Sequence, residues 1–367
     1  MLGTMFIPAK RIVLAASLFL AADAPGQSYD LKANWSNAQN PNGPWVYREG
    51  TNALPAVMGW QGAPWDVAQP GWARGTQSPG AFVPFWFKSN GAEGFSNGWE
   101  VGDVVVHTTG GPEGGANGAA NVVWNSPLDG SITLTGGVWA GREIGRAQRF
   151  TLSHNSLRLS TGVMATGDSY NRIYPFTFAG GASSGQVLMN RDVARGDTIK
   201  IEAAPAVAGG PGDFVGMNLN IIVCIGVVQD PRHALMCPGG NAALTMQART
   251  SYGTISYRWR RAGVPLLEGG RFHGVFAPTL TITGVIASDA AVYDCVVGSV
   301  CSTIASRSAT LTICRADFDC SGTLNALDLF EFMNGWFAAD PRADFNGING
   351  TDPQDIFDFV GAWFVGC

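Results

Sequence analysis

The 367-residue chain has few charged side chains: Asp, Glu, Lys and Arg make up 14%, and the formal net charge is −5. A protein that binds a polyanion needs an excess of positive charge, which this chain lacks, so nucleic acid is excluded as an electrostatic partner. Histidine is also rare. The four histidines of the chain are too far apart in sequence to form a metal-ligand motif. Beyond position 26, no segment has the length and apolar character of a transmembrane helix.

The N-terminus has the pattern of an export signal. Lys10 and Arg11 form a positively charged region, and the apolar run 12–22 that follows is too short to anchor a chain stably in a bilayer. Small residues at 24–26 offer a cleavage site before Gln27. We predict a signal peptide over residues 1–26 and a secreted or cell-surface protein that does not span the membrane after cleavage. The alternative is a buried N-terminal helix.

Cysteine is absent before position 224, and the seven copies stand at 224, 237, 295, 301, 314, 320 and 367. In an exported protein, this usage indicates disulfide bonds. Because seven is an odd number, at least one thiol is free or pairs outside the chain.

Glycine is abundant, with 49 copies, and 46% of the residues are hydrophobic. Much glycine with little charge is typical of turn-rich β modules rather than of helical bundles. A chain of this length is expected to form two or three domains. We predict a mainly β protein with a β-sandwich module over 27–228, a second β module over 229–313 and a small α-helical module over 314–367.

Short runs of strand-forming residues alternate with Gly, Asn and Pro turns in the first module. The strand candidates are 101–108, 120–124, 131–134, 148–153, 156–160, 197–202 and 214–223. Gly102-Asp103 and Gly196-Asp197 each predict a tight turn that leads into a strand. Regularly spaced short strands without a helical period favour a β-sandwich.

Two segments of this module carry a resemblance. Asn40-Pro41-Asn42-Gly43-Pro44-Trp45 resembles the opening of uncharacterised non-catalytic β-sandwich modules in secreted proteins of planctomycete-like bacteria. The run 212–221 resembles the final strand of the same modules. The resemblance implies a non-catalytic module of unknown ligand.

Nine of the twelve tryptophans lie in the first module. Four of them gather in the loop-rich region 55–90, namely Trp60, Trp65, Trp72 and Trp86. They either fill the core of the sandwich or form an exposed platform on which sugar rings stack. We favour the core, and polysaccharide binding is the alternative.

Two patterns raise the question of catalysis. The segment 181–185 matches a nucleophile elbow around Ser183, but it lies in a Gly/Ser turn between β runs, where the preceding parallel strand and the following helix are missing. A glycosidase would need two facing carboxylates, and the candidates are Asp103, Asp129, Glu143 and Asp213. Because Gly-Asp at a turn is usually structural, we predict no enzyme. The alternatives are a secreted polysaccharide-degrading enzyme with its catalytic module at 27–228 and a structural surface or adhesion protein.

The second module contains Trp259 in an alternating run and, further on, the string Asp289-Ala-Ala-Val-Tyr293-Asp-Cys295. This pattern resembles strand F of an immunoglobulin-like domain, which implies a corner hydrogen bond from Tyr293 and a core position for Trp259. Residues 244 and 246, where a strand B cysteine is expected, are Leu and Met. The usual disulfide between the sheets is therefore absent. Cys295 with Cys301, or Cys237 with one of these two, are the open alternatives.

The third module is acidic and duplicated. Nine acids and two bases give residues 314–367 a net charge of −7, which leaves +2 for the rest of the chain. Matching residues recur at an offset of 27, as in Asp317 with Asp344 and Trp336 with Trp363. A repeat of this kind predicts two loop–helix units that pack on each other. A bound cation would neutralise the concentrated charge.

The first copy meets the demands of a calcium loop. Calcium takes about six to eight oxygens, which a twelve-residue loop supplies from positions 1, 3, 5, 7, 9 and 12, with glycine at position 6. The glycine is Gly322, and the predicted ligands are Asp317, Asp319, Ser321, the Thr323 carbonyl, Asn325 through a water molecule, and Asp328. We therefore predict calcium as the cofactor. The alternative is an acidic, solvated helical tail.

The second copy fits less well. Its predicted ligands are Asp344, Asn346, the Gly350 carbonyl, Asp352 and Asp355. Ile348 at position 5 has no oxygen, while Asn349 at position 6 tolerates the left-handed conformation. We expect the first site to bind calcium more tightly than the second.

Each loop ends in Asp and precedes a single helix, and the pair is flanked by Cys314 and the final Gly366-Cys367. These features resemble a dockerin rather than a complete EF-hand, in the variant that ends in Gly-Cys in secreted planctomycete proteins. The resemblance implies a Cys314–Cys367 bridge. It also implies a calcium-dependent anchor that binds a cohesin-like or other surface-anchoring protein.

One departure concerns the partner. Loop positions 10 and 11 are Ala326 and Leu327 in the first copy and Pro353 and Gln354 in the second. Typical dockerins carry small hydroxyl residues there, which help to select the cohesin, so a standard cohesin partner is not expected. We predict a secreted, non-catalytic binding and display protein.

Overall fold

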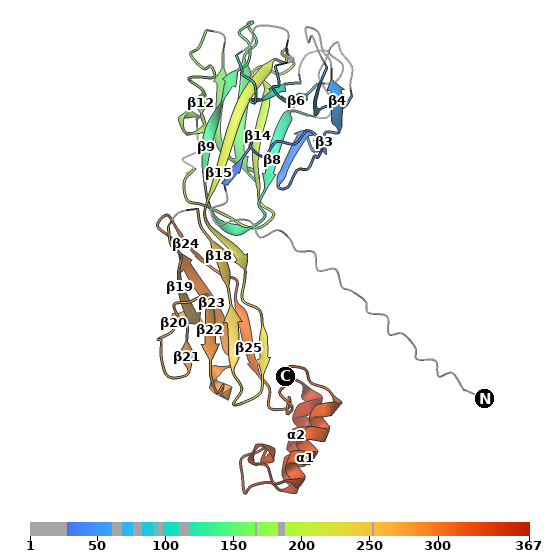
Figure 1. Ribbon diagram of the computed structural model, residues 1–367, viewed down its shortest axis with the longest axis vertical. Coiled ribbons are helices and arrows are strands. Elements are labelled where there is room, and N and C mark those ends of the chain that lie inside the picture. The colour runs from blue at the N-terminus through green and yellow to red at the C-terminus, as the bar shows by residue number, and fades with distance from the viewer. Residues whose placement is uncertain are drawn as a thin grey trace, which may run out of the picture.

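The computed structural model describes residues 28–60, 68–75, 83–91, 93, 98–109, 118–165, 167–182, 188–251 and 253–367. The predicted signal peptide, Trp65 and Ser183 lie outside these ranges. Three modules follow one another along the long axis, two of β structure and one with a pair of helices (Figure 1). The protein is mainly β, as the sequence predicts.

Two antiparallel sheets form the first module. The larger contains β1 (Ser28–Asp30), β4 (Ala56–Trp60), β5 (Gln69–Trp72), β6 (Phe85–Lys88), β7 (Val104–His107), β9 (Asp129–Ala140), β12 (Phe176–Thr177), β13 (Arg191–Val193), β15 (Phe214–Gln229) and β18 (Gln247–Arg249). The smaller contains β2 (Trp45–Glu49), β3 (Asn52–Ala53), β8 (Ala120–Asn125), β10 (Gln148–His154), β11 (Leu157–Met164) and β14 (Thr198–Pro205). Each of the seven predicted runs contains a strand.

The core of this module lies between the two sheets. Trp86 and Val106 from the larger sheet and Trp124 and Phe150 from the smaller one belong to the same buried cluster. A second, smaller aromatic cluster lies on the other side of the larger sheet's edge strands, where Trp60 stacks on Phe85 with ring centroids 3.9 Å apart. The core interpretation is confirmed for three of the four tryptophans, because Trp60, Trp72 and Trp86 are buried and their faces are closed to a sugar ring.

Both predicted Gly-Asp turns are present. Gly102 and Gly196 have φ values of 93° and 91°, which a residue with a side chain rarely adopts. In each turn the following aspartate accepts a hydrogen bond from the backbone N–H three residues before it, at 2.9 Å for Asp103 and 2.8 Å for Asp197. The turn chemistry explains why these two aspartates stand at the start of strands.

Asp213 is a buried carboxylate just before β15. One of its oxygens, Oδ1, accepts a hydrogen bond from the N–H of Phe214 at 2.8 Å, while Oδ2 is buried without a partner among the described residues. Burial raises the pKa of Asp213 to about 6. An ionised Asp213 therefore costs the folded state free energy.

The first module is expected to lose stability as the pH rises through about 6. The folded pKa of Asp213 lies above the unfolded value of about 4, so its stabilising contribution is complete below pH 4 and is lost as the folded group ionises. Asp213→Asn cannot ionise at this position. Its free energy of unfolding should therefore exceed that of the parent by about 1–3 kcal/mol at pH 8 and be nearly equal to it at pH 4. Denaturant titrations at both pH values measure this, with the exposed Asp192→Asn as control. A gain of equal size at both pH values would contradict the prediction.

The second module is a sandwich of two smaller sheets. One contains β16 (Ala234–Met236), β19 (Ser256–Arg261), β20 (Val264–Pro265), β23 (Ala291–Gly298), β24 (Thr303–Ala305) and β25 (Ala309–Ile313), and the other contains β17 (Ala242–Thr245), β21 (Phe272–His273) and β22 (Thr279–Ile282). Tyr293 donates its hydroxyl to the Asp289 carbonyl at 2.8 Å, and Trp259 is fully buried. Both features confirm the immunoglobulin-like interpretation.

The core of the second module closes without a disulfide. Leu244 and Met246, at the expected positions of the strand B cysteine, lie in the same buried cluster as Cys295. The Cys295 thiol is free. The two alternatives for Cys295 and Cys237 are therefore wrong, because Cys237 bonds to Cys320 instead.

One strand belongs to both β modules. β15 pairs with β9 of the first module as far as Val227, yet its residues Ile225 and Val227 are buried in the core of the second module. The strand also pairs with β18, which follows β17 in the chain. The backbone hydrogen bonds of β15 thus continue from the end of the first module into the start of the second.

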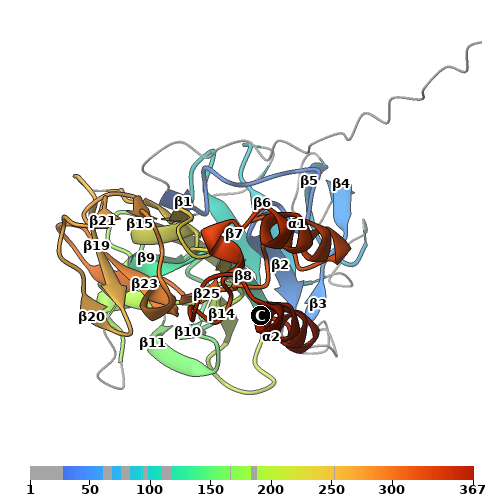
Figure 2. The same ribbon diagram turned by 90° about the horizontal axis from the view of Figure 1, so that it is seen from below.

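The third module contains α1 (Ala326–Phe337) and α2 (Pro353–Val365), which lie side by side (Figure 2). Three short 3₁₀ helices complete the described elements: η2 (Phe178–Gly180), η3 (Ala287–Asp289) and η4 (Pro341–Ala343). Across the described ranges, no helix combines the length and the apolar character that crossing a membrane requires.

Candidate metal centre

The first acidic loop gathers three carboxylates. One oxygen each from Asp317, Asp319 and Asp328 lies within 4.8 Å of the others. Asp317 and Asp328 are buried, with exposed fractions of 1% and 0%. The sequence prediction that these three side chains converge is therefore confirmed.

Hydrogen bonds to the backbone hold the loop in this shape. Asp328 accepts from the N–H of Asp319 at 3.2 Å with Oδ1 and from the N–H of Asn325 at 2.8 Å with Oδ2. Asn325 in turn caps α1 by accepting from the N–H of Leu327 at 2.8 Å. At position 6, Gly322 has a φ of 79°, as the predicted sharp turn requires. The carboxylate at the end of the loop thus joins the loop to its helix.

The pKa values show the electrostatic cost of the cluster. Burial, hydrogen bonding to Asp319 and the neighbouring charge of Asp328 raise the pKa of Asp317. The pKa of Asp319 is lowered instead, chiefly by the hydrogen bond from the N–H of Ser321. A cation between these carboxylates would remove the penalty on Asp317.

The other predicted ligands of the first copy lie along the same loop. Ser321 donates its hydroxyl to the Thr323 carbonyl at 3.1 Å, which brings positions 5 and 7 together. Asn325 uses its oxygen as the helix cap and donates its Nδ2 to the Thr323 carbonyl at 3.1 Å. The loop atoms that could coordinate a metal are all oxygens, so this set of atoms fits a hard cation such as calcium.

The second loop repeats the first at the same offset. Asp355 accepts from the N–H groups of Asn346 at 3.0 Å and of Asp352 at 2.8 Å, as Asp328 does from Asp319 and Asn325. Asp344 and Asn346 both accept from the N–H of Ile348, at 3.0 Å and 2.8 Å.

The second loop offers a poorer set of ligands. Asn346 replaces the second carboxylate, and the Ile348 side chain is exposed at the position where Ser321 offers a hydroxyl. Asn349 adopts the left-handed conformation with a φ of 64°, as expected, and the next residue, Gly350, has a φ of 76°. Backbone hydrogen bonds from Asp352, Asn346 and Phe345 outweigh burial and lower the pKa of Asp355. Asp355, the counterpart of Asp328, is thus a carboxylate whose charge the backbone of its own loop stabilises.

The helices share a core with two-fold pseudo-symmetry. Phe332 and Phe359, which occupy equivalent positions in the two repeats, stack with ring centroids 4.0 Å apart and an interplanar angle of 7°. Phe318 and Phe345 each approach both rings edge-on, at 5.5 Å within their own repeat and at 6.2 Å across to the other. The aromatic positions of the repeat thus build one core from two incomplete halves.

Tryptophan hydrogen bonds cross between the two repeats. Trp336 donates its indole N–H to the Asp352 carbonyl at 2.9 Å, and Trp363 donates to the Asn325 carbonyl at 3.0 Å. Each acceptor stands at position 9 of the other repeat's loop. The geometry of each loop therefore depends on the position of the other repeat's helix.

Two disulfides fix the module in place. Cys314 bonds to Cys367, which confirms the bridge that the dockerin resemblance implies. Cys237 of the second module bonds to Cys320 at position 4 of the first loop, a link that sequence reasoning missed. The Cys314 N–H also donates to the Met236 carbonyl at 2.8 Å. The first loop is therefore attached covalently to the second module.

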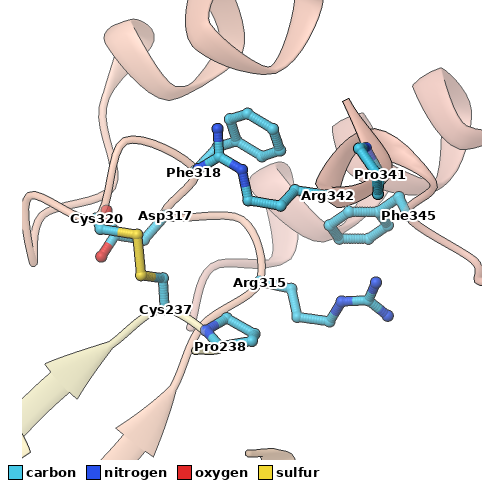
Figure 3. A pocket seen from close by; sticks show the side chains of 9 residues that line it. All are labelled: Cys237, Pro238, Arg315, Asp317, Phe318, Cys320, Pro341, Arg342 and Phe345. Carbon is cyan, nitrogen blue, oxygen red and sulfur yellow. A yellow bond between two sulfur atoms is a disulfide. The ribbon is translucent and has the colours of Figure 1, made fainter. Parts of the chain in front are cut away.

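A cavity of about 140 Å³ lies beside this link (Figure 3). Cys237 and Pro238 from the second module and Asp317, Arg315 and Arg342 from the third are among the side chains that line it. The two arginines, which occupy equivalent positions in the repeats, lie over the rings of Phe345 and Phe318 with their Cζ atoms at 4.7 Å and 4.9 Å from the ring centroids. The predicted ligand Asp317 thus lies at the junction of the two modules.

Three of the four candidate carboxylates of the first module have structural contacts. Asp103 forms ion pairs with Lys32 at 3.0 Å and with Arg172 at 2.6 Å. Asp129 accepts from the N–H of Arg195 at 2.8 Å. Asp213 is buried, as described above, and Glu143 is exposed on the rim of a shallow surface cavity.

No protein-family model matches the chain, and no curated protein matches it significantly. Solved structures similar to 24% of the chain include titin M4, at 21% identity over 94% of its own length with a TM-score of 0.23. They also include the Ig-like domain of human leucine-rich repeat-containing protein 4, at 25% identity over 84% of its length with a TM-score of 0.21. A C. elegans twitchin kinase fragment with immunoglobulin domains is 15% identical over 20% of its length, with a TM-score of 0.22.

Proposed function

We propose that the chain is a secreted binding and display protein whose third module is a calcium-dependent, dockerin-like anchor for a cohesin-like or other surface-anchoring protein. Two disulfides support an oxidising, extracellular location. Calcium would be held by Asp317, Asp319, Asp328, the Ser321 hydroxyl and the Thr323 carbonyl. When bound, it would neutralise the loop and hold α1 in position.

The observation that carries the proposal is an exposed aromatic stripe on each helix. On α1, Phe330 and Phe337 are 64% and 75% exposed, and on α2 the residues at the equivalent positions, Phe357 and Phe364, are 71% and 77% exposed. Residues seven apart lie on one face of a helix, so each pair forms a stripe. Large aromatic side chains held outward on a rigid scaffold are typical of surfaces that bind another protein.

Affinity capture from the envelope of the source cell tests this proposal. The immobilised full chain is expected to retain a partner in calcium and to release it when a chelator is added. The double variant Phe330→Ser and Phe357→Ser should reduce capture of that same partner at least about tenfold, since buried aromatic anchors are worth more than about 1.4 kcal/mol at interfaces. Leu267→Ser, at a 79% exposed apolar residue of the second module, is the matched control. Equal capture by the double variant and the control would contradict the proposal.

A further inference from the structure

Two cysteines from different modules meet where the first and second modules join. Cys224 lies on β15, and Cys301 lies in the turn between β23 and β24. Ser299 connects them, because its hydroxyl donates to the Cys224 carbonyl at 3.4 Å and lies 3.4 Å from the Cys301 sulfur. Burial raises the pKa of Cys224 and the neighbouring Cys301 raises it further, as expected of two thiols that lie near each other.

The local backbone accounts for the position of Cys224. The register between β15 and β9 shifts between Val223 and Ile225, so Cys224 is the extra residue of a β-bulge. A bulge changes the direction of a side chain relative to regular pairing. The Cys224 thiol is buried and donates to Asn190 Oδ1 at 3.3 Å.

Hydrogen bonds within residues 299–302 hold the turn that carries Cys301. The Ser299 N–H donates to the Ser302 carbonyl at 2.9 Å, and the Cys301 N–H donates to the Ser299 hydroxyl at 3.3 Å. Cys301 is partly exposed. One thiol of the pair is therefore shielded and the other is accessible from solvent.

From this geometry we infer that Cys224 and Cys301 form a third disulfide, which links the first module covalently to the second in the exported protein. The assignment also accounts for the odd number of cysteines. With Cys237–Cys320 and Cys314–Cys367 formed, the single remaining thiol is Cys295, which is buried in the core of the second module.

The oxidant is a low-molecular-weight disulfide such as oxidised glutathione. The accessible Cys301 thiolate attacks one glutathione sulfur, the glutathione disulfide breaks, and one glutathione thiolate leaves. The Cys224 thiolate then attacks the Cys301 sulfur of the mixed disulfide and expels the second glutathione thiolate. The two cysteines lose two protons and two electrons, and one glutathione disulfide becomes two glutathione thiols. Burial raises the pKa of Cys224, so the second step is expected to be the slower one and to accelerate with pH.

Thiol counting on the full chain tests the inference. After incubation in a glutathione redox buffer and denaturation, the parent is expected to show one thiol, against three if only the two disulfides of the structure form. Cys301→Ser should show two thiols, and Cys295→Ala should show none. A non-reduced peptide map of the parent should contain one cross-linked species with Cys224 and Cys301, about 2 Da lighter than the two peptides together.

The peptide map decides the question even if a variant fails to fold. Three free thiols in the parent after prolonged oxidation would overturn the inference. So would a map in which Cys224 or Cys301 is joined to any other cysteine.

Discussion

Asp328→Ala is expected to weaken calcium binding to the chain more than about a hundredfold, because it removes a carboxylate at the centre of the ligand set and not merely a neighbour of one. The side chain is fully buried and accepts from two backbone N–H groups of the loop. Its loss would therefore remove a proposed ligand and also loosen the loop. Calorimetric titration of the full chain with calcium measures the affinity.

The matched control for this experiment is Glu331→Ala. Glu331 is an exposed acid on the same helix and is not a predicted ligand, so it tests the effect of net charge alone. In the parent, calcium at a hundred times its dissociation constant should raise the unfolding free energy by about 2.7 kcal/mol. An affinity of Asp328→Ala equal to that of Glu331→Ala would show that the loop does not hold the ion.

Phe332→Ala is expected to destabilise the third module by about 3–5 kcal/mol. The ring is fully buried, stacks on Phe359 and contacts the edges of Phe318 and Phe345, so its removal leaves a cavity that the disulfide-bonded chain cannot easily close. The loss is large for a module of this size, because small domains bury little surface.

Amide hydrogen exchange of α1 and α2 in the full chain measures this effect without interference from the β modules. Phe330→Ala provides the control. It removes the same phenyl group two positions away, where the Phe330 side chain is 64% exposed. We expect that control to change the opening free energy by less than about 0.5 kcal/mol. If both variants exchanged at the same rate, the shared aromatic core would not be what stabilises the pair of helices.

Strands with one buried face could be predicted from their alternation, and β7 and β8 were predicted although both of their faces are covered. The alternating run of β14, for example, places Ile199, Ile201 and Ala203 in the core and Lys200 and Glu202 outside it. Strands β6 and β2, which were not predicted, show no alternation because both of their faces are covered. In β6, Trp86 faces the main core while Phe85 and Phe87 belong to the outer aromatic cluster, so the run shows no period of two.

The acidic loop was predictable because its carboxylates are close together in sequence. Positions 1 to 12 of a loop fix one another through local hydrogen bonds, and the same spacing recurs in both copies. The Cys237–Cys320 bond was not predictable, because its two ends are separated by a complete module and meet only after that module has folded. The one local signal was a cysteine at position 4 of the loop, where it adopts a φ of 60°.

That bond also determines how tension would pass through the molecule. Cys237 and Cys320 stand 83 positions apart in the sequence, and the residues between them include nearly all of the immunoglobulin-like module. A pull between the helices and the first module would cross the sulfur–sulfur bond and continue through β16 into β15, so the strands that follow Cys237 would be bypassed. Stretched out, those residues would lengthen the connection by up to about 280 Å. The disulfide would prevent that lengthening.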